Sequence, residues 1–330
     1  MIASVAFRNF KALRNTSLQL APFNLVLGPN GSGKTSLIES LLQLRALSQL
    51  PIQTESSETS ATDTPDIRFR FDEPHAKVEA RLSCVSDVVC DALELSPSGY
   101  AQWPSLQAAI SRVRSFNFEH AAIGAPALRS AGQRLAANGS NLAAVLAGWK
   151  QDAPETWTVF SNETIRLFPE FSRLDVAPRG DEFIALSFTL KSGEVVDGAA
   201  LSQGMLYMLA MLSLSFAPSP PSMVCVEEID RGIHPRMLRE VRDAFYRLSY
   251  PESFGMTRPP TQVIATTHSP YLLDLLRDHP EEIVISHKTG TAAHFERLSE
   301  RRDLAELLQE GSLGDIWFSG ILGGVPEEKP

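Results

Sequence analysis

A glycine-rich turn near the N-terminus is the feature that most restricts how this chain can fold. Residues 28–35 read Gly-Pro-Asn-Gly-Ser-Gly-Lys-Thr and fit the pattern G-x-x-x-x-G-K-[S/T] at every fixed position. A short apolar run at 23–27 precedes the turn, and apolar residues at helical spacing follow it between 35 and 50. Such a turn lets backbone N–H groups surround an anion, toward which the positive end of the following helix also points. The segment predicts a phosphate-binding loop in an α/β fold.

Two side chains of this loop carry the expected chemistry. Lys34 would reach the β- and γ-phosphates of a nucleotide, and the Thr35 hydroxyl would be a ligand of Mg²⁺. The residues expected to bind the nucleotide in this loop are Asn30, Gly31, Ser32, Gly33, Lys34, Thr35 and Ser36. The turn alone does not distinguish an ATPase from a GTPase or a kinase, so the later segments must decide.

Polar side chains follow two further apolar strands. Glu227 and Glu228 come after the run at 223–226, and His268 comes shortly after the run at 263–265. Ligands of open α/β sheets bind at the carboxyl ends of the strands, so these residues are expected to meet the loop at one sheet edge. Glu227 could then hold Mg²⁺, Glu228 could orient or deprotonate the attacking water, and His268 could bond the γ-phosphate. The alternatives are a solvated acidic strand end and an ordinary loop histidine.

A second anion site is suggested at the start of the apolar helix 202–216. Ser202 is a favourable N-cap, which is its simplest interpretation. Together with Gln203 and Gly204 it could also close over a nucleotide that another subunit holds. Asp230 lies in the turn that links the two acids to the next helix, 235–248.

Strands alternating with helices in the last third predict a largely parallel α/β sheet. The middle of the chain, 67–195, has the mixed pattern of inserted α+β material. A Ser/Thr-rich stretch at 51–66 contains four acids and no Lys or Arg, which predicts a mobile acidic loop. The net charge of −9 over 330 residues excludes a generally basic polyanion binder, so any nucleic-acid contact would be local.

The chain has three cysteines, which form neither a CxxC motif nor a Cys/His cluster. Without a signal-peptide pattern, this favours reduced intracellular thiols and packed side chains at Cys84 and Cys90. No apolar run reaches the length of about 18 residues that a membrane span needs. We therefore expect a cytoplasmic protein with no membrane partner.

Together these segments resemble the ABC-type ATPase heads of the SMC/RecF kind. The similarity is greater to stand-alone bacterial ATPases related to the ATPase half of OLD-family nucleases. The segments that carry it are 5–13, 28–36 (Walker A), 201–205 (ABC signature), 224–228 (Walker B), 228–235 and 267–270 (switch histidine). The 168 positions from Lys34 to Ser202 suit a RecF-like head with an inserted lobe.

The resemblance implies a P-loop ABC-type head with an N-terminal β-rich lobe and an inserted α+β lobe. Its expected ranges are 1–66 (strands, P-loop and acidic loop), 67–200 (insert) and 201–330 (signature, Walker B and switch-histidine core). It also implies a head-to-tail homodimer around Mg-ATP, in which Lys34 and Thr35 of one chain face Ser202 and Gly204 of the other. The implied roles are catalytic carboxylate for Glu228, γ-phosphate sensor for His268 and cross-dimer contact for Asp230.

Two features depart from the family pattern. Glu227 stands where the family usually has Asp, which leaves the turnover rate and the metal preference open. The Q-loop glutamine is not assigned, and the candidates are Gln43, Gln49, Gln102 and Gln107.

The expected role is an ATP-driven conformational switch in DNA repair or anti-phage defence. Only 64 residues follow Thr266, so no Toprim nuclease half fits, and a separate nuclease, toxin or reverse transcriptase would act as effector. DNA is a further candidate partner, through arginines on the helix after Walker B: Arg236, Arg239, Arg242 and Arg247. A solvated, ion-paired helix face is the simpler interpretation of these arginines. The alternative functions are an ATP-binding scaffold with a near-dead site, a transporter ATPase subunit and a small-molecule kinase.

Overall fold

The computed structural model describes residues 1–52, 64–132 and 134–323, so most of the predicted acidic loop lies outside the described residues. Contacts divide the chain into two compact units. The first contains residues 1–115, 221–229 and 258 onward, and the second contains 116–220 and 230–257.

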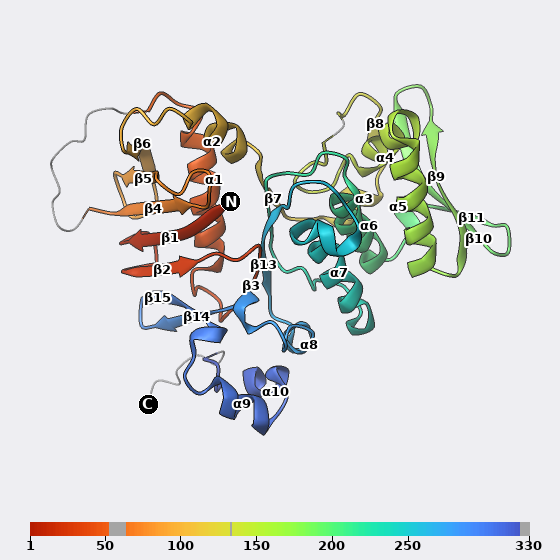
Figure 1. Ribbon diagram of the computed structural model, residues 1–330. Coiled ribbons are helices and arrows are strands. Elements are labelled where there is room, and N and C mark those ends of the chain that lie inside the picture. Colours follow the sequence, from red (N-terminus) through yellow and green to blue (C-terminus); the bar gives the residue numbers. More distant parts are fainter. Residues whose placement is uncertain (53–63, 133, 324–330) are drawn as a thin grey trace. The chain divides into compact units, whose positions relative to one another are not determined.

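A six-stranded sheet forms the centre of the first unit (Figure 1). Its strands, in order across the sheet, are β15 (Ala292–Arg297), β14 (Ile283–Thr289), β3 (Phe23–Leu27), β13 (Gln262–Thr267), β12 (Met223–Val226) and β7 (Val113–Phe116). The pairs β14–β3, β3–β13 and β13–β12 are parallel, and β15 runs antiparallel to β14. Every residue of β3, β12 and β13 is buried, which explains their continuous apolar runs.

A second, antiparallel sheet of the first unit contains the N-terminal strand (Figure 1). Its order is β2 (Thr16–Gln19), β1 (Ile2–Arg8), β4 (Asp66–Phe71), β5 (Glu79–Cys84) and β6 (Cys90–Ser96). Burial alternates along β4 and β5, as expected for a sheet with one face on the core. Because β4 pairs with β1 along six residue pairs, strands inside the predicted 67–200 insert share a sheet with the N-terminal segment. The predicted division of the chain into those ranges stays a prediction.

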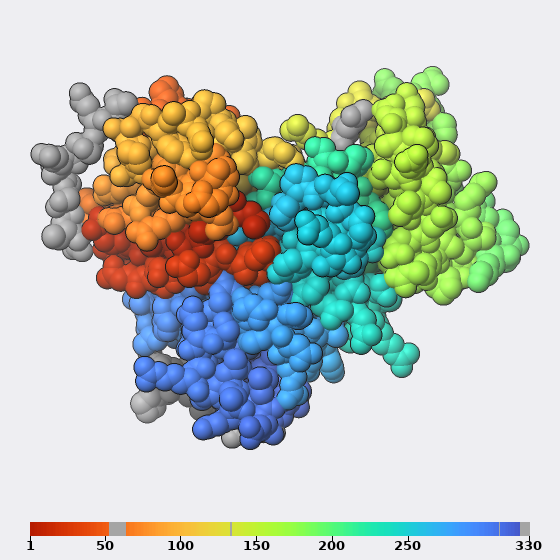
Figure 2. All heavy atoms as spheres, in the orientation of Figure 1, coloured from red at the N-terminus to blue at the C-terminus, as the bar shows by residue number. Residues whose placement is uncertain are grey.

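The two sheets share one hydrophobic core with α1 (Lys34–Leu47), which places Leu37, Leu41 and Leu44 in it. The N-terminal strands and the C-terminal part of the chain lie side by side, as the red and blue surfaces of the first unit show in Figure 2. The Phe295 N–H donates to Thr16 Oγ1 at 3.1 Å across this boundary. The other helices of this unit are α2 (Trp103–Ile110), α8 (Pro270–Asp274), α9 (Leu304–Glu310) and α10 (Leu313–Phe318).

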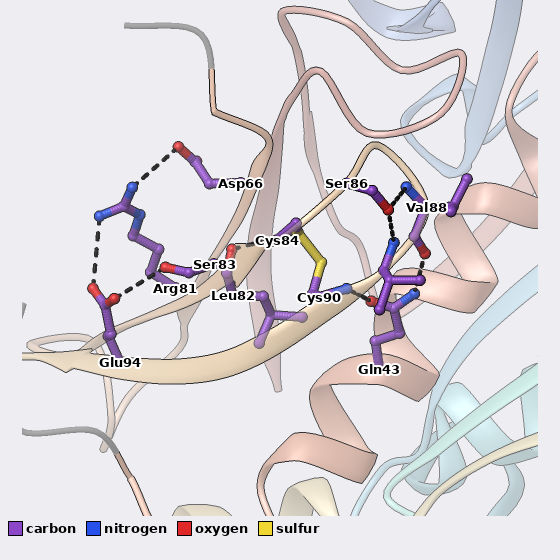
Figure 3. The surroundings of a disulfide bond; sticks show 11 residues. Gln43, Asp66, Arg81, Leu82, Ser83, Cys84, Ser86, Val88, Cys90 and Glu94 are labelled. Carbon is purple, nitrogen blue, oxygen red and sulfur yellow. Dashed lines mark hydrogen bonds and ion pairs between the residues drawn. A yellow bond between two sulfur atoms is a disulfide. The ribbon is translucent and has the colours of Figure 1, made fainter. Parts of the chain in front are cut away.

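A disulfide joins Cys84 and Cys90 across β5 and β6, so the prediction of packed thiols is wrong for this pair (Figure 3). The two cysteines face each other in neighbouring antiparallel strands, a register that a search for CxxC spacing cannot detect. Closing so short a loop stabilises the fold by about 2 kcal/mol. Gln43 of α1 holds the same hairpin, because its amide donates to the Val88 carbonyl and accepts from the Cys90 N–H.

Cys225 is a free, buried cysteine, and burial raises the pKa of its thiol to about 12.

The second unit packs helices against a small antiparallel sheet. In that sheet β10 (Phe183–Leu190) pairs with β9 (Phe171–Arg179), with β11 (Val195–Asp197) and with β8 (Ala127–Leu128). The helices are α3 (His120–Gly124), α4 (Leu142–Asp152), α5 (Pro154–Leu167), α6 (Gln203–Phe216) and α7 (Leu238–Ser249). A turn at 191–194 connects β10 and β11, and the Leu190 N–H donates to the Glu194 carbonyl at 2.8 Å.

The helix α6 is buried along its whole length from Leu206 to Phe216, which agrees with its apolar sequence. Short 3₁₀ turns occur at Gly198–Ala200, Pro235–Met237, Pro251–Phe254, Pro280–Glu282 and Leu298–Glu300. Within the residues that the structure describes, no helix has both the length and the apolar character needed to cross a membrane.

Candidate functional site

The glycine-rich turn connects β3 directly to α1, as the sequence predicts. Gly31 and Gly33 have φ angles of 73° and 95°, a conformation that favours glycine. Gly33 is the N-cap of α1 and provides no side-chain cap, so the first-turn N–H groups of the helix stay available to an anion.

Lys34 lies inside this turn and is buried, with 9% of its surface exposed. Its ammonium group donates to the carbonyls of Gly28 at 2.8 Å and Pro29 at 2.9 Å. Burial lowers the pKa of Lys34, and the carboxylates of Glu227 and Glu228 partly oppose that change. The turn and the two acids are therefore close enough to interact electrostatically.

Thr35 and Glu227 contact each other directly. The Thr35 hydroxyl donates to Glu227 Oε2 at 2.8 Å, which joins the start of α1 to the end of β12. Both side chains provide the hard oxygen ligands that Mg²⁺ prefers. In the described part of the chain no group of three or more His, Cys, Asp or Glu residues could hold a metal alone. Magnesium at Thr35 and Glu227 would thus need phosphate and water oxygens to complete its coordination.

Glu228 is exposed and has a φ angle of 51°, which is uncommon for a residue with a side chain. Its N–H donates to the Thr266 hydroxyl at 3.0 Å, and the next N–H, of Ile229, donates to the Thr266 carbonyl at 3.0 Å. The backbone at the second acid is therefore attached to β13.

His268 follows β13 directly and is exposed. Since β13 lies between β3 and β12 in a parallel arrangement, its carboxyl end is beside both the phosphate-binding turn and the two acids. The expected meeting of these three strand ends at one sheet edge is confirmed. The catalytic and binding roles of the individual residues stay predictions.

The signature-like residues belong to the second unit. Ser202 is the N-cap of α6, and its hydroxyl accepts from the Met205 N–H at 3.4 Å. Gly204 packs against the turn that follows Asp230, because a Cβ there would lie 2.7 Å from the Gly232 carbonyl oxygen. Gln203 also contacts Gly232, and its amide donates to the Tyr207 hydroxyl at 3.3 Å. The start of α6 and the Asp230 turn therefore form one packed substructure.

The arginines on and before α7 differ in their surroundings. Arg242 pairs with Asp243 at 2.7 Å and lies over the Tyr246 ring. Arg247 is half-buried between the rings of Phe216 and Phe254. Arg236 and Arg239 are exposed, and neither has an ion-pair partner in the part of the chain that the structure describes.

Sequence reasoning missed Thr266 and Ser286. Ser286 of β14 is buried, and its hydroxyl donates to the Ser32 carbonyl inside the phosphate-binding turn. The apolar residues at 283–285 are typical of a strand, but no local pattern predicts that this strand pairs with β3. The strand order alone brings both residues to the site.

Two family comparisons cover these segments. Residues 99–274 match the family described as "AAA domain, putative AbiEii toxin, Type IV TA system", and residues 1–83 match the family described as "AAA ATPase domain". The first match spans more than half of the chain and includes the signature-like residues, the two acids and His268. The second includes the phosphate-binding turn. No curated protein matches the sequence significantly.

Solved structures with a similar fold include Smc head domains. One is the crystal structure of an Smc head bound to the C-winged helix domain of ScpA. The match to it covers 92% of this chain and 99% of the Smc chain, with a TM-score of 0.60 and 16% identity. Another is the Smc head domain with an extended coiled coil bound to the C-terminal domain of ScpA, derived from Pyrococcus furiosus. The match to it covers 93% of this chain and 99% of the Smc chain, with a TM-score of 0.56 and 10% identity. The chain has the SMC-head, ABC-type ATPase fold, and the predicted fold class is confirmed.

Proposed function

The chain belongs to the AAA-domain family that residues 99–274 match, and from this premise we propose that it binds Mg-ATP and hydrolyses it to ADP and phosphate. One observation supports this most strongly. Lys34, the Thr35–Glu227 pair and Glu228 gather at one sheet edge, where the two carboxylates act on the pKa of the lysine. A phosphate-binding turn beside two acids can position a nucleotide, hold its metal ion and orient an attacking water, which phosphoryl transfer to water needs.

Each residue has a distinct task in this proposal. Lys34 exchanges its two carbonyl partners for β- and γ-phosphate oxygens, while the N–H groups of Gly31 to Lys34 surround the phosphates. Thr35 and Glu227 would hold Mg²⁺, which when bound would neutralise charge that develops on the phosphates. Glu228 accepts a proton from the attacking water, and His268 donates to the γ-phosphate.

We further propose that two copies enclose the nucleotides head to tail. Ser202, Gln203 and Gly204 would then offer the start of α6 to the γ-phosphate that the other copy holds, as helix N-termini do for anions. Asp230 would contact the partner copy through the turn that packs on Gly204. Release of phosphate would separate the copies, so turnover would act as a conformational switch.

The test of hydrolysis and dimerisation uses Glu228→Gln. This variant should bind ATP, turn it over at least a hundredfold more slowly and accumulate as a dimer in light scattering at saturating Mg-ATP. Lys34→Ala should abolish both binding and dimerisation. A Glu228→Gln protein that stays monomeric at saturating ATP contradicts the dimer.

A complementation experiment tests the shared site directly. Lys34→Ala and Ser202→Arg should each be inactive alone, because each spoils both composite sites of a homodimer. Mixed together, they form a heterodimer with one intact site, and part of the ATP turnover should return. A mixture as inactive as its components would contradict composite sites.

A scaffold with a near-dead site is the second candidate, and Glu227 is the observation that favours it. Its side chain accepts from the Thr35 hydroxyl and is longer than the Asp that is usual at this position in the ABC-type heads that the chain resembles. Glu227→Asp should then raise single-turnover phosphate release, whereas the ATPase proposal expects measurable release from the unchanged protein.

The biological role that we propose is DNA repair or anti-phage defence in the cytoplasm, with the effector on a separate chain. The similar Smc heads are bound to ScpA, which supports a partner protein on a separate chain. The matched family description carries the words toxin and type IV toxin–antitoxin system for the domain itself, which supports a role in defence. The effector that we propose is a toxin, a nuclease or a reverse transcriptase.

A further inference from the structure

The backbone at Glu228 is held in a conformation that a glutamate rarely adopts. Among the described residues with side chains, positive φ angles occur at Asn9, Lys11 and Glu228. A left-handed backbone places Cβ close to the carbonyl oxygen, so it persists only where neighbouring atoms enforce it. Strain of this kind at the acid next to the phosphate-binding turn requires a structural cause.

Thr266 is the residue that contacts this backbone from the neighbouring strand. Its hydroxyl accepts from the Glu228 N–H, and its carbonyl accepts from the Ile229 N–H, both at 3.0 Å. Thr266 and Ile229 are each 2% exposed, so water does not compete for these two bonds. Two consecutive amides are thus attached to one buried residue.

The parallel register explains why this residue can reach that backbone. Val226 is opposite Ala265, so Thr266 is the next position of β13 as the chain leaves β12. A strand continuing straight would bond only main-chain groups of β13. The Thr266 hydroxyl supplies an additional acceptor for the Glu228 N–H at the point where the chain turns away from β12. Because this acceptor belongs to a side chain, a substitution can remove it.

We propose that Thr266 is a positioning residue that holds Glu228 in the left-handed conformation and thereby directs its carboxylate toward the nucleotide. The inference rests on the proposed function, in which Glu228 acts on the attacking water. Thr266 lies two positions before His268, and the intervening Thr267 hydroxyl accepts from the Ser269 N–H at 3.0 Å. The end of β13 therefore supports both the acid and the histidine loop.

The experiment compares Thr266→Val, which keeps the branched shape and removes the hydroxyl, with Thr266→Ser, which keeps the hydroxyl. Thr261→Val is the matched control. Thr261 is also buried, at 1% exposure, and its hydroxyl bonds the Pro221 carbonyl at 2.8 Å. For each protein we would measure kcat and KM for ATP, and hydrogen exchange at the Glu228 and Ile229 amides without nucleotide.

Thr266→Val should lower kcat about tenfold to a hundredfold, because a misplaced catalytic group is that costly, while KM changes less than threefold. Exchange at the Glu228 amide should become at least tenfold faster. Thr266→Ser should keep kcat and the exchange rate of the Glu228 amide within about threefold of the unchanged protein. Thr261→Val should leave kcat and that exchange rate unaltered. In a Glu228→Gln background, Thr266→Val should cause no further loss of kcat, since the two changes affect one function.

Wild-type kcat together with unchanged amide exchange in Thr266→Val would overturn the proposal. An equal kcat loss with and without Glu228→Gln would also overturn it, because Thr266 would then act through another group. Absence of ATP turnover in the unchanged protein would count against the proposed function instead, and the exchange measurement would still decide whether Thr266 holds the Glu228 backbone. If Thr266→Val does not fold, Thr266→Ser still tests the idea, and a kcat loss as large as tenfold in it contradicts the proposal.

Discussion

Gly28→Ala isolates the packing that shapes the phosphate-binding turn. Gly28 does not have a positive φ angle, so its backbone would accept alanine, and only space excludes the side chain. A Cβ there would collide with the Ser286 carbonyl oxygen and would lie 2.7 Å from Ser32 Oγ and 2.9 Å from Ser286 Cβ. Ordinary contacts begin near 3.4 Å, so the turn and β14 would have to separate by roughly 1 Å.

The magnitude follows from what holds β14 in place. Ser286 pairs with Phe295 of β15, and the preceding Ile285 pairs with Leu27 of β3. Overpacking of this kind costs about 1–3 kcal/mol, and each weakened ladder bond adds about 1 kcal/mol. We expect a loss of about 3 kcal/mol in the free energy of unfolding. Displacing the turn should also remove about two phosphate hydrogen bonds, which weakens ATP binding about 30-fold.

The assay is urea unfolding followed by circular dichroism, together with titration of a fluorescent ATP analogue. Gly311→Ala is the control, because its φ angle is 178° and a Cβ there meets nothing within 4 Å. Gly290→Ala separates backbone strain from steric collision, because Gly290 has a φ angle of 59° and a Cβ there meets nothing within 4 Å. This substitution should lower the free energy of unfolding by about 1 kcal/mol through backbone strain alone. A Gly28→Ala protein within 0.5 kcal/mol of the unchanged protein, with the same ATP affinity, would refute the reasoning.

Two further predictions concern charge. Burial lowers the pKa of Lys34 below the ordinary 10.5, and bound phosphates should raise this pKa again. ATP affinity should therefore decline as the pH rises through the lowered pKa, and binding should take up protons, which calorimetry in buffers of different ionisation enthalpy detects. An affinity that stays constant to pH 10 contradicts this prediction. If DNA stimulates hydrolysis, joint Arg236→Glu and Arg239→Glu substitution should abolish the stimulation and leave basal turnover intact, because these arginines are exposed. Arg242 is a poorer probe, since it pairs with Asp243, and unchanged stimulation in the double variant rejects the DNA-binding surface.

Local patterns predicted the phosphate-binding turn, the flanking strand and helix, and the acids and histidine at strand ends. These features depend on properties of single residues and their neighbours, such as the freedom of glycine at Gly31 and Gly33. Cys84 and Cys90 were wrongly predicted as packed thiols, because their disulfide depends on the register of two strands. Thr266 and Ser286 carry no local signature at all.

The sequence by itself determined that this chain contains a phosphate-binding loop, that acids and a histidine follow later strands, and that the elements alternate as in an α/β sheet. Only the tertiary structure decided that β13 lies between β3 and β12, which places Thr266 against the Glu228 backbone and Glu227 against Thr35. The reason is physical. Parallel strands pair through main-chain groups that are the same in every residue, so their order is set by the packing of distant segments and not by any local pattern.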